Sequence, residues 1–139
     1  MWPFITDVPS AVQMIMLISC VLMGLSHLLQ PQIWSTFFAH LVERGTFGLV
    51  ANQFLNSAPG AIIVALHQVW TGPAIILTLY GWALLLKAVI ALVVAPNVGM
   101  RSLKMSRHGD NAFRIGGVGL LGVGVACALA LARIWVAAT

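Results

Sequence analysis

The sequence predicts an all-α membrane protein with four transmembrane helices and a short amphipathic helix between the first two. Three observations lead to this fold class. Of the 139 residues, 60% are hydrophobic and only 7% are charged, and the mean hydropathy is +1.00, so the chain cannot present its whole surface to water. Four apolar stretches have the length of about 20 residues that crosses a bilayer. A fifth stretch has the periodicity of an amphipathic helix.

The predicted spans use most of the chain and are joined by short connections. They cover about residues 11–29, 46–70, 72–95 and 114–136. Since no room is left for a soluble domain, residues 1–139 form a single four-helix transmembrane domain. The first ten residues carry Asp7 and neither Lys nor Arg. They therefore lack the basic start of a secretory signal, and we expect the first span to be retained.

Residues 33–44 have a different order of apolar and polar side chains from the predicted spans. Their apolar side chains Trp34, Phe37, Phe38 and Leu41 recur at i, i+3, i+4 and i+7, with polar side chains on the opposite side. This pattern predicts an amphipathic helix that lies at the membrane surface. The alternative is a helix that contacts another protein.

The basic residues predict the orientation of the chain in the membrane. Three of the seven, Arg101, Lys104 and Arg107, lie between the third and fourth spans. Cytoplasmic loops are enriched in Lys and Arg. We therefore expect a bacterial inner (plasma) membrane protein with loops 31–47 and 97–113 in the cytoplasm and both termini outside. The same rule accounts for the net charge of +4, so the expected partner is the lipid bilayer and not nucleic acid.

Lys87 is the only side chain between Thr71 and Pro96 that is ionised at neutral pH. The second and third spans form a hairpin, which places Asn56 and Lys87 at nearly equal depth. Other polar side chains lie on or beside the same helix faces, and lipid cannot hydrogen-bond them. We therefore predict a polar intramembrane cluster of Lys87, Asn56, Gln53, Asn52, Tyr80 and His67.

Two positions of the Lys87 side chain are compatible with the sequence. Its flexible stem can carry the ammonium group towards the cytoplasmic headgroups. Alternatively, the side chain is buried among the amides and exchanges a proton. On the preceding span, Pro59 cannot donate a hydrogen bond to the Leu55 carbonyl, which gives the cluster a further acceptor at mid-depth.

The last predicted span is crowded with small residues. Rows of small residues spaced four apart allow helices to approach closely. We expect one row to meet the bundle and the other to meet a second copy of the protein, in a homo-oligomer or a larger membrane complex. The two rows are Gly122, Ala126 and Ala130, and Gly124, Ala128 and Ala132.

No arrangement typical of a catalytic, cofactor or metal site is found in the sequence. His27 and His67 are expected at opposite membrane faces, whereas two histidines that hold a haem need matched depth. The spacing of His27, His40 and Glu43 is not that of a zinc site, and the cysteines have no CxxC spacing. We assign no catalytic residue, cofactor or metal.

A resemblance supports the architecture. The segment that includes HQVWTGP, LTLYGWALLLKA and a terminal proline resembles a group of uncharacterised small bacterial four-span integral membrane proteins. These share a His-Asn-x-x-Trp-like turn followed by Thr-x-x-Gly-Trp-x-x-x-x-Lys-Gly. Gln68 and Ala88 depart from the usual Asn and Gly. The resemblance covers about half of the chain and implies four spans, but no activity. The matching residues are His67, Trp70, Thr78, Gly81, Trp82, Lys87 and Pro96.

Three functions are compatible with the sequence. The first is a non-catalytic structural or accessory subunit whose polar residues satisfy one another. The second is a channel or carrier for a proton, ion or small polar solute through the Lys87 and Asn56 cluster. The third is a membrane enzyme or cofactor-binding subunit. Glu43 and Arg44 before a polar helix are similar to a feature of the small four-span eicosanoid and glutathione enzymes, but the rest of their Arg, His, Asn and Glu pattern is absent.

Overall fold

A computed structural model of the protein describes residues 5–106 and 109–138, and all regular structure in this part is helical. The predicted all-α class is confirmed. Four segments, α1, α3, the segment from η1 to η2, and α6, are long and apolar enough to cross a membrane. The elements are α1 (Val8–Leu29), α2 (Pro31–Glu43), α3 (Gly45–Leu66), the 3₁₀ turn η1 (Gly72–Ala74), α4 (Ile75–Val89), the π-helical turn η2 (Ile90–Val94), α5 (Pro96–Ser106) and α6 (Asp110–Ala138).

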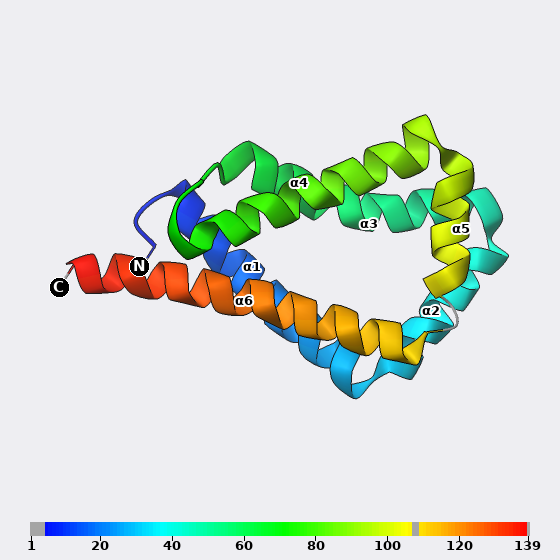
Figure 1. Ribbon diagram of the computed structural model, residues 1–139, viewed down its shortest axis with the longest axis horizontal. Helices are drawn as coiled ribbons and strands as arrows, with labels where there is room; N and C mark the ends of the chain where they lie inside the picture. Colours follow the sequence, from blue (N-terminus) through cyan, green and yellow to red (C-terminus); the bar gives the residue numbers. More distant parts are fainter. Residues whose placement is uncertain (1–4, 107–108, 139) are drawn as a thin grey trace.

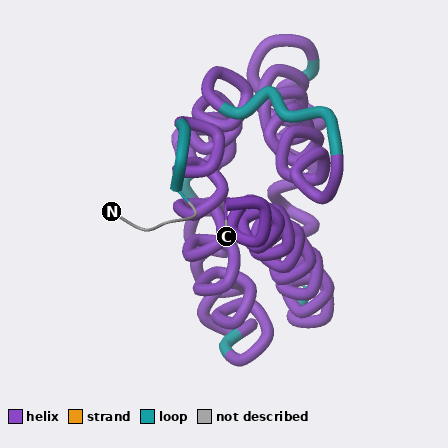
Figure 2. Tube along the Cα trace, turned by 90° about the vertical axis from the view of Figure 1, so that its left-hand side faces the viewer, coloured by secondary structure: helices purple, strands orange, loops and turns teal. Residues whose placement is uncertain are grey.

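The long helices form two pairs. Helix α1 lies along α6, and α3 lies along α4 (Figure 1). The pairs meet at the end of the molecule that holds η1 and diverge towards the other end, where α2 and α5 connect them. The view along the long axis shows that short loops join the helices (Figure 2). The chain therefore forms a bundle that is closed at one end and splayed at the other.

Local chemistry explains where α1, α2 and α3 begin. Asp7 is the N-cap of α1, and its carboxylate accepts a hydrogen bond of 2.8 Å from the Ser10 backbone N–H. Helix α2 begins at Pro31, whose fixed φ suits the first helical turn. Gly45 then separates α2 from α3 with a φ of +58°, a conformation that glycine adopts without steric cost.

Residues 97–113 were expected to be a loop, and this expectation is wrong for most of the segment, because α5 occupies Pro96–Ser106. Gly99 and Leu103 are spaced four apart and are both buried, whereas Arg101 and Lys104 are exposed. Leu103 packs in one cluster with buried residues of α2, α3 and η2. The segment is therefore a second amphipathic helix. The sequence of this segment shows its basic residues clearly, whereas its apolar stripe is short. Arg107 lies outside the described residues.

The glycines mark where paired helices approach most closely. In the α1–α6 pair, a Cβ atom on Gly117 would lie 2.8 Å from the Gly24 carbonyl oxygen. In the α3–α4 pair, a Cβ atom on Gly60 would lie 3.1 Å from the Gly81 carbonyl oxygen. Both contacts bring two backbones together, as small residues allow in membrane helices. The pairs are thus held by glycine-to-glycine contacts that the two predicted rows on α6 do not include.

The two predicted rows on α6 do not each form one face. Ala126 and Ala130 are buried in the bundle, but a Cβ atom on Gly122 would meet nothing within 4 Å. In the second row, Gly124 packs against α1 while Ala132 is exposed. Along its length the first row therefore turns from the surroundings into the bundle, and the second turns out of it, because a spacing of four residues drifts around a helix with 3.6 residues per turn.

Gly117→Ala should destabilise the protein by about 1–3 kcal/mol, because the new Cβ atom would overlap the backbone of α1. Gly122→Ala on the same helix is the matched control and should be neutral or stabilising by about 0.5–1 kcal/mol, since alanine favours a helix. Unfolding of both variants in mild detergent, followed by circular dichroism, measures the difference. Equal stability of the two variants would contradict the close contact of α1 with α6.

Candidate functional site

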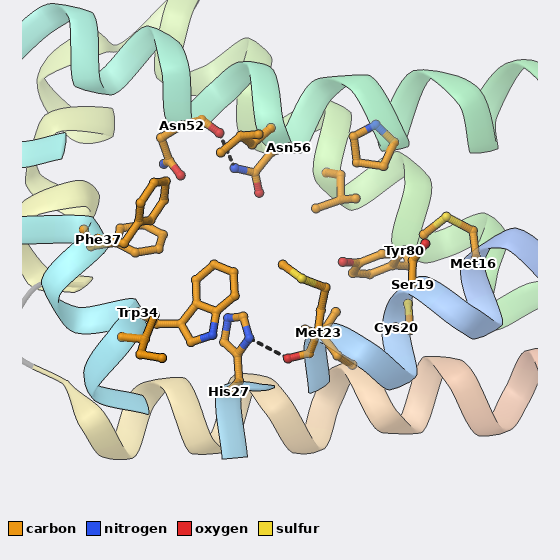
Figure 3. Close-up of a pocket in the computed structure, with 16 residues that line it drawn as sticks. Met16, Ser19, Cys20, Met23, His27, Trp34, Phe37, Asn52, Asn56 and Tyr80 are labelled. Carbon is orange, nitrogen blue, oxygen red and sulfur yellow. Dashed lines mark hydrogen bonds between the residues drawn. The ribbon is translucent and has the colours of Figure 1, made fainter. Parts of the chain in front are cut away.

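A cavity of about 540 Å³ lies between the two helical pairs. Its volume falls in the range of about 300–1,000 Å³ that is usual for small-molecule sites. Residues of α1, α2, α3 and α4 line it, together with Leu120 of α6. Figure 3 shows Asn52 and Asn56 on one side, His27 and Trp34 on the opposite side, and Tyr80 at a third side. The cavity therefore has polar groups on several walls of an otherwise apolar lining.

The aromatic wall is held in place by hydrogen bonds. The rings of His27 and Trp34 stack with their centroids 4.2 Å apart. His27 Nδ1 lies 2.7 Å from the Met23 carbonyl oxygen, to which it donates, and Trp34 Nε1 donates to Ser26 Oγ at 2.9 Å. The first bond holds the His27 ring against its own helix, and the second joins α1 to the start of α2. As a result, the two rings form a fixed flat surface beside the cavity (Figure 3).

The opposite wall carries the amides of α3. Asn56 Nδ2 donates to the Asn52 carbonyl oxygen at 2.6 Å, and Asn56 Oδ1 accepts from Lys87 Nζ at 3.3 Å. Asn52 is buried, and within the described chain neither its side-chain amide nor the Tyr80 hydroxyl has a hydrogen-bond partner. Both residues line the cavity. The site therefore offers two polar groups that are available to a bound molecule.

The expected contact between Lys87 and Asn56 is present at 3.3 Å. Lys87 also lines a second pocket of about 340 Å³ between α4 and α5, together with Gln53. Gln53 is 1% exposed, and its Oε1 has no partner among the described residues. Since Asn56 lines the larger cavity, the Lys87–Asn56 bond lies between the two pockets.

The predicted cluster is divided between separate places. Asn52, Asn56 and Tyr80 line the large cavity, and Gln53 and Lys87 line the smaller pocket. His67 belongs to neither. It follows the last residue of α3, about 16 Å along the helix axis from Asn56 at a rise of about 1.5 Å per residue. His67 therefore lies at another depth than the equal depth expected for Asn56 and Lys87.

His67 instead joins a buried network at the closed end. Gln13 Nε2 lies 2.9 Å from His67 Nε2, and His67 Nδ1 lies 3.1 Å from Thr78 Oγ1. The Thr78 hydroxyl donates to the Val69 carbonyl oxygen at 2.7 Å. Thr78 Oγ1 must then accept from His67 Nδ1–H, and His67 Nε2 must accept from the Gln13 amide. Burial lowers the His67 pKa and so favours this neutral ring, which links α1, the α3–η1 connector and α4.

Sequence reasoning missed Gln13 and Thr78 as partners of His67. Two signals could have found them. Gln13 is the only amide side chain within the first span, and Thr78 belongs to the resembled pattern together with His67. All three side chains are buried, at 3% exposure or less. A buried polar group needs a partner, so these isolated polar residues could have been paired.

The described residues contain no group of three metal-binding side chains. His40 and Glu43 form an exposed pair of 3.3 Å on α2. His27 stacks on Trp34 instead. The two cysteines are free and lie in the buried core.

No family model, curated protein or solved structure matches the chain. The class of protein is therefore defined by its own features. Four apolar helices indicate a multi-pass membrane protein, built from two helical pairs with a cavity between them.

The stability of the protein should fall as the pH decreases from about 7.5 to about 5. Burial of His67, in the connector between two spans, lowers its pKa, although its backbone hydrogen bond and the charge of Asp7 act in the opposite direction. The unfolded chain binds a proton with the ordinary pKa of about 6.5. The contribution of neutral His67 to the stability of the folded state is thus complete above about pH 6.5, and it is lost as the pH falls through the lower pKa of His67 in the folded state.

Thermal unfolding of the detergent-solubilised protein across this pH range tests the effect. His67→Gln should reduce the pH dependence, whereas His40→Gln should retain it because His40 is exposed on α2. A pH dependence in His67→Gln that equals that of the wild type would rule out His67 as its source.

Proposed function

We propose that this chain is a non-catalytic accessory protein of a membrane that holds a small lipophilic molecule between its two helical pairs. The observation that carries this proposal is the cavity of about 540 Å³, on whose walls the Asn52 amide and the Tyr80 hydroxyl have no hydrogen-bond partner among the described residues. Ligand sites are mostly apolar cavities in which a few polar groups fix the orientation of the ligand. Asn52 and Tyr80 have that role here.

The walls favour a ring compound with oxygen substituents. The stacked His27 and Trp34 rings present a flat aromatic surface (Figure 3), and aromatic rings associate through stacked or edge-to-face contacts. The Asn52 amide can donate and accept, and so can the Tyr80 hydroxyl. A ring that carries hydroxyl or carbonyl groups would satisfy both, while an apolar remainder would contact Met16, Met23 and the leucines of the lining.

Protein purified in mild detergent should carry such a compound, detectable by mass spectrometry of its organic extract. Met23→Trp fills part of the cavity, and Asn52→Leu removes a polar group, so each should reduce the bound compound by about tenfold or more. Ile18→Trp is the control, because Ile18 lies on the same helix as Met23 but is 61% exposed and does not line the cavity. An extract with only membrane phospholipids, in equal amounts for all variants, would count against the proposal.

The position of Lys87 supports a second candidate, a conduit or carrier for a proton, ion or small polar solute. The bond between Lys87 and Asn56 joins side chains from two different pockets, and ionisable residues within spans often mark transport pathways. Lys87→Met should then abolish most of the flux in proteoliposomes. Lys104→Met on the exposed side of α5 should not. Absence of flux of protons, ions and small solutes in the wild type would exclude this function.

We also infer how the protein lies in its membrane. The end of the molecule with α2 and α5 carries the exposed residues Arg101 and Lys104. Their charge supports a cytoplasmic location for this end of an inner-membrane protein, with both termini outside. Helix α2 would lie at the interface, with its exposed polar side chains Gln32, His40 and Glu43 towards the headgroups and its aromatic side towards the cavity. Exposed small residues of α6 support contact with a second copy or a larger complex.

Labelling of single cysteines at Thr71 and Ser102 in intact cells tests the orientation, and cross-linking along α6 tests the contact.

A further inference from the structure

A separate polar pocket of about 450 Å³ lies at the closed end of the molecule. Three segments that are distant in sequence form it: the N-terminal end of α1, the connector with η1, and the last part of α6. Figure 1 shows these segments together at the end that holds the chain termini. The pocket is distinct from the cavity of the proposed function, with which it shares no lining residue.

Two opposite charges line this pocket without pairing. Asp7 and Arg133 both contribute to its walls, but within the described residues no oxygen of Asp7 lies within 4.0 Å of the Arg133 guanidinium. Asp7 Oδ1 accepts from the Ser10 backbone N–H. Arg133 Nη1 lies over the turn, at 3.2 Å from the position a Cβ atom would take on Gly72. A negative and a positive group therefore face one space from different segments.

A buried acceptor without a donor lines the same pocket. Gln13 is 3% exposed, and its Oε1 has no hydrogen-bond partner in the described chain. Reversal of the amide would require a proton on both ring nitrogens of His67, and burial, which lowers the His67 pKa, disfavours that charged ring. Gln13 Oε1 therefore requires a donor from outside the network, because a buried acceptor without a hydrogen bond is unfavourable.

We propose that this pocket binds a small zwitterion in which a primary ammonium group and a carboxylate or phosphate lie a few atoms apart. The ammonium group donates to Gln13 Oε1 and pairs with Asp7. The anionic group accepts from Arg133, whose planar fork of N–H groups suits carboxylate and phosphate. Such a molecule satisfies all three groups together.

Simpler ligands leave part of the site unsatisfied. An inorganic anion pairs with Arg133 but brings no positive charge to Asp7, and a simple cation leaves Arg133 without an anion. A quaternary ammonium group carries charge but has no N–H to donate. The required chemistry is present both in a free zwitterion and in an ethanolamine phospholipid headgroup, and the pocket lies at the end of the spans, where lipid headgroups and soluble molecules both have access.

Isothermal titration of the full-length protein in mild detergent tests the proposal. The probes are O-phosphoethanolamine and dihexanoyl phosphatidylethanolamine, and the controls are phosphocholine and dihexanoyl phosphatidylcholine. We expect saturable binding of at least one ethanolamine probe, with the matching choline compound weaker by about tenfold or more. Binding of the free probe alone identifies a soluble zwitterion, and binding of the lipid alone identifies a headgroup. Absence of saturable binding by both ethanolamine probes would overturn the proposal.

Variants locate the binding in this pocket. Asp7→Asn removes the charge but retains a side chain that caps helices well, and Arg133→Gln removes the cation. Each should weaken binding of the ethanolamine probe by about tenfold or more. The controls Asp110→Asn and Arg114→Gln alter charges at the opposite end of α6 and should bind as the wild type does. Wild-type affinity in Asp7→Asn and Arg133→Gln, with unchanged thermal unfolding, would overturn the assignment.

Discussion

The hydrogen-bond network of Gln13, His67 and Thr78 joins the two helical pairs at one end of the molecule. It connects α1, which belongs to one pair, with the connector and α4 of the other pair. Because these groups are buried, leaving any of them unpaired would carry a desolvation cost of about 1–3 kcal/mol. The network therefore specifies how the pairs meet, and a core cluster with Val12, Ile63 and Leu77 packs nearby.

The packing at the closed end leads to the cavity between the two helical pairs. Glycine contacts hold α1 to α6 and α3 to α4, whereas the two pairs are joined at the closed end by the network and by a core cluster with residues of α1, α3, α4 and α6. The pairs diverge instead (Figure 1), and α2 and α5 bridge them through the cluster that contains Leu41 and Leu103. The large cavity follows from this geometry, because helices that touch at one end and are separated at the other enclose a space between them.

Much of the fold could be predicted from composition and periodicity. Four long apolar stretches have few alternatives to spanning helices, and the stripe of Trp34, Phe37 and Leu41 predicts a helix because its period is close to 3.6. Helix α5 could not be found in the same way, because its apolar stripe is short and its most visible feature is charge. The Lys87–Asn56 contact was predictable from equal depth in a hairpin, which is a local relationship along the chain.

The sequence by itself determined the helical class, the approximate spans and the hairpin that brings Asn56 to Lys87. These depend on local periodicity and on neighbours in the chain. Only the tertiary structure decided that Gln13 meets His67 and that Gly24 meets Gly117. Each of those contacts joins segments that are distant in sequence. Their register depends on how the two helical pairs pack, and hydrophobic periodicity constrains the face of a helix without fixing its depth or its partner.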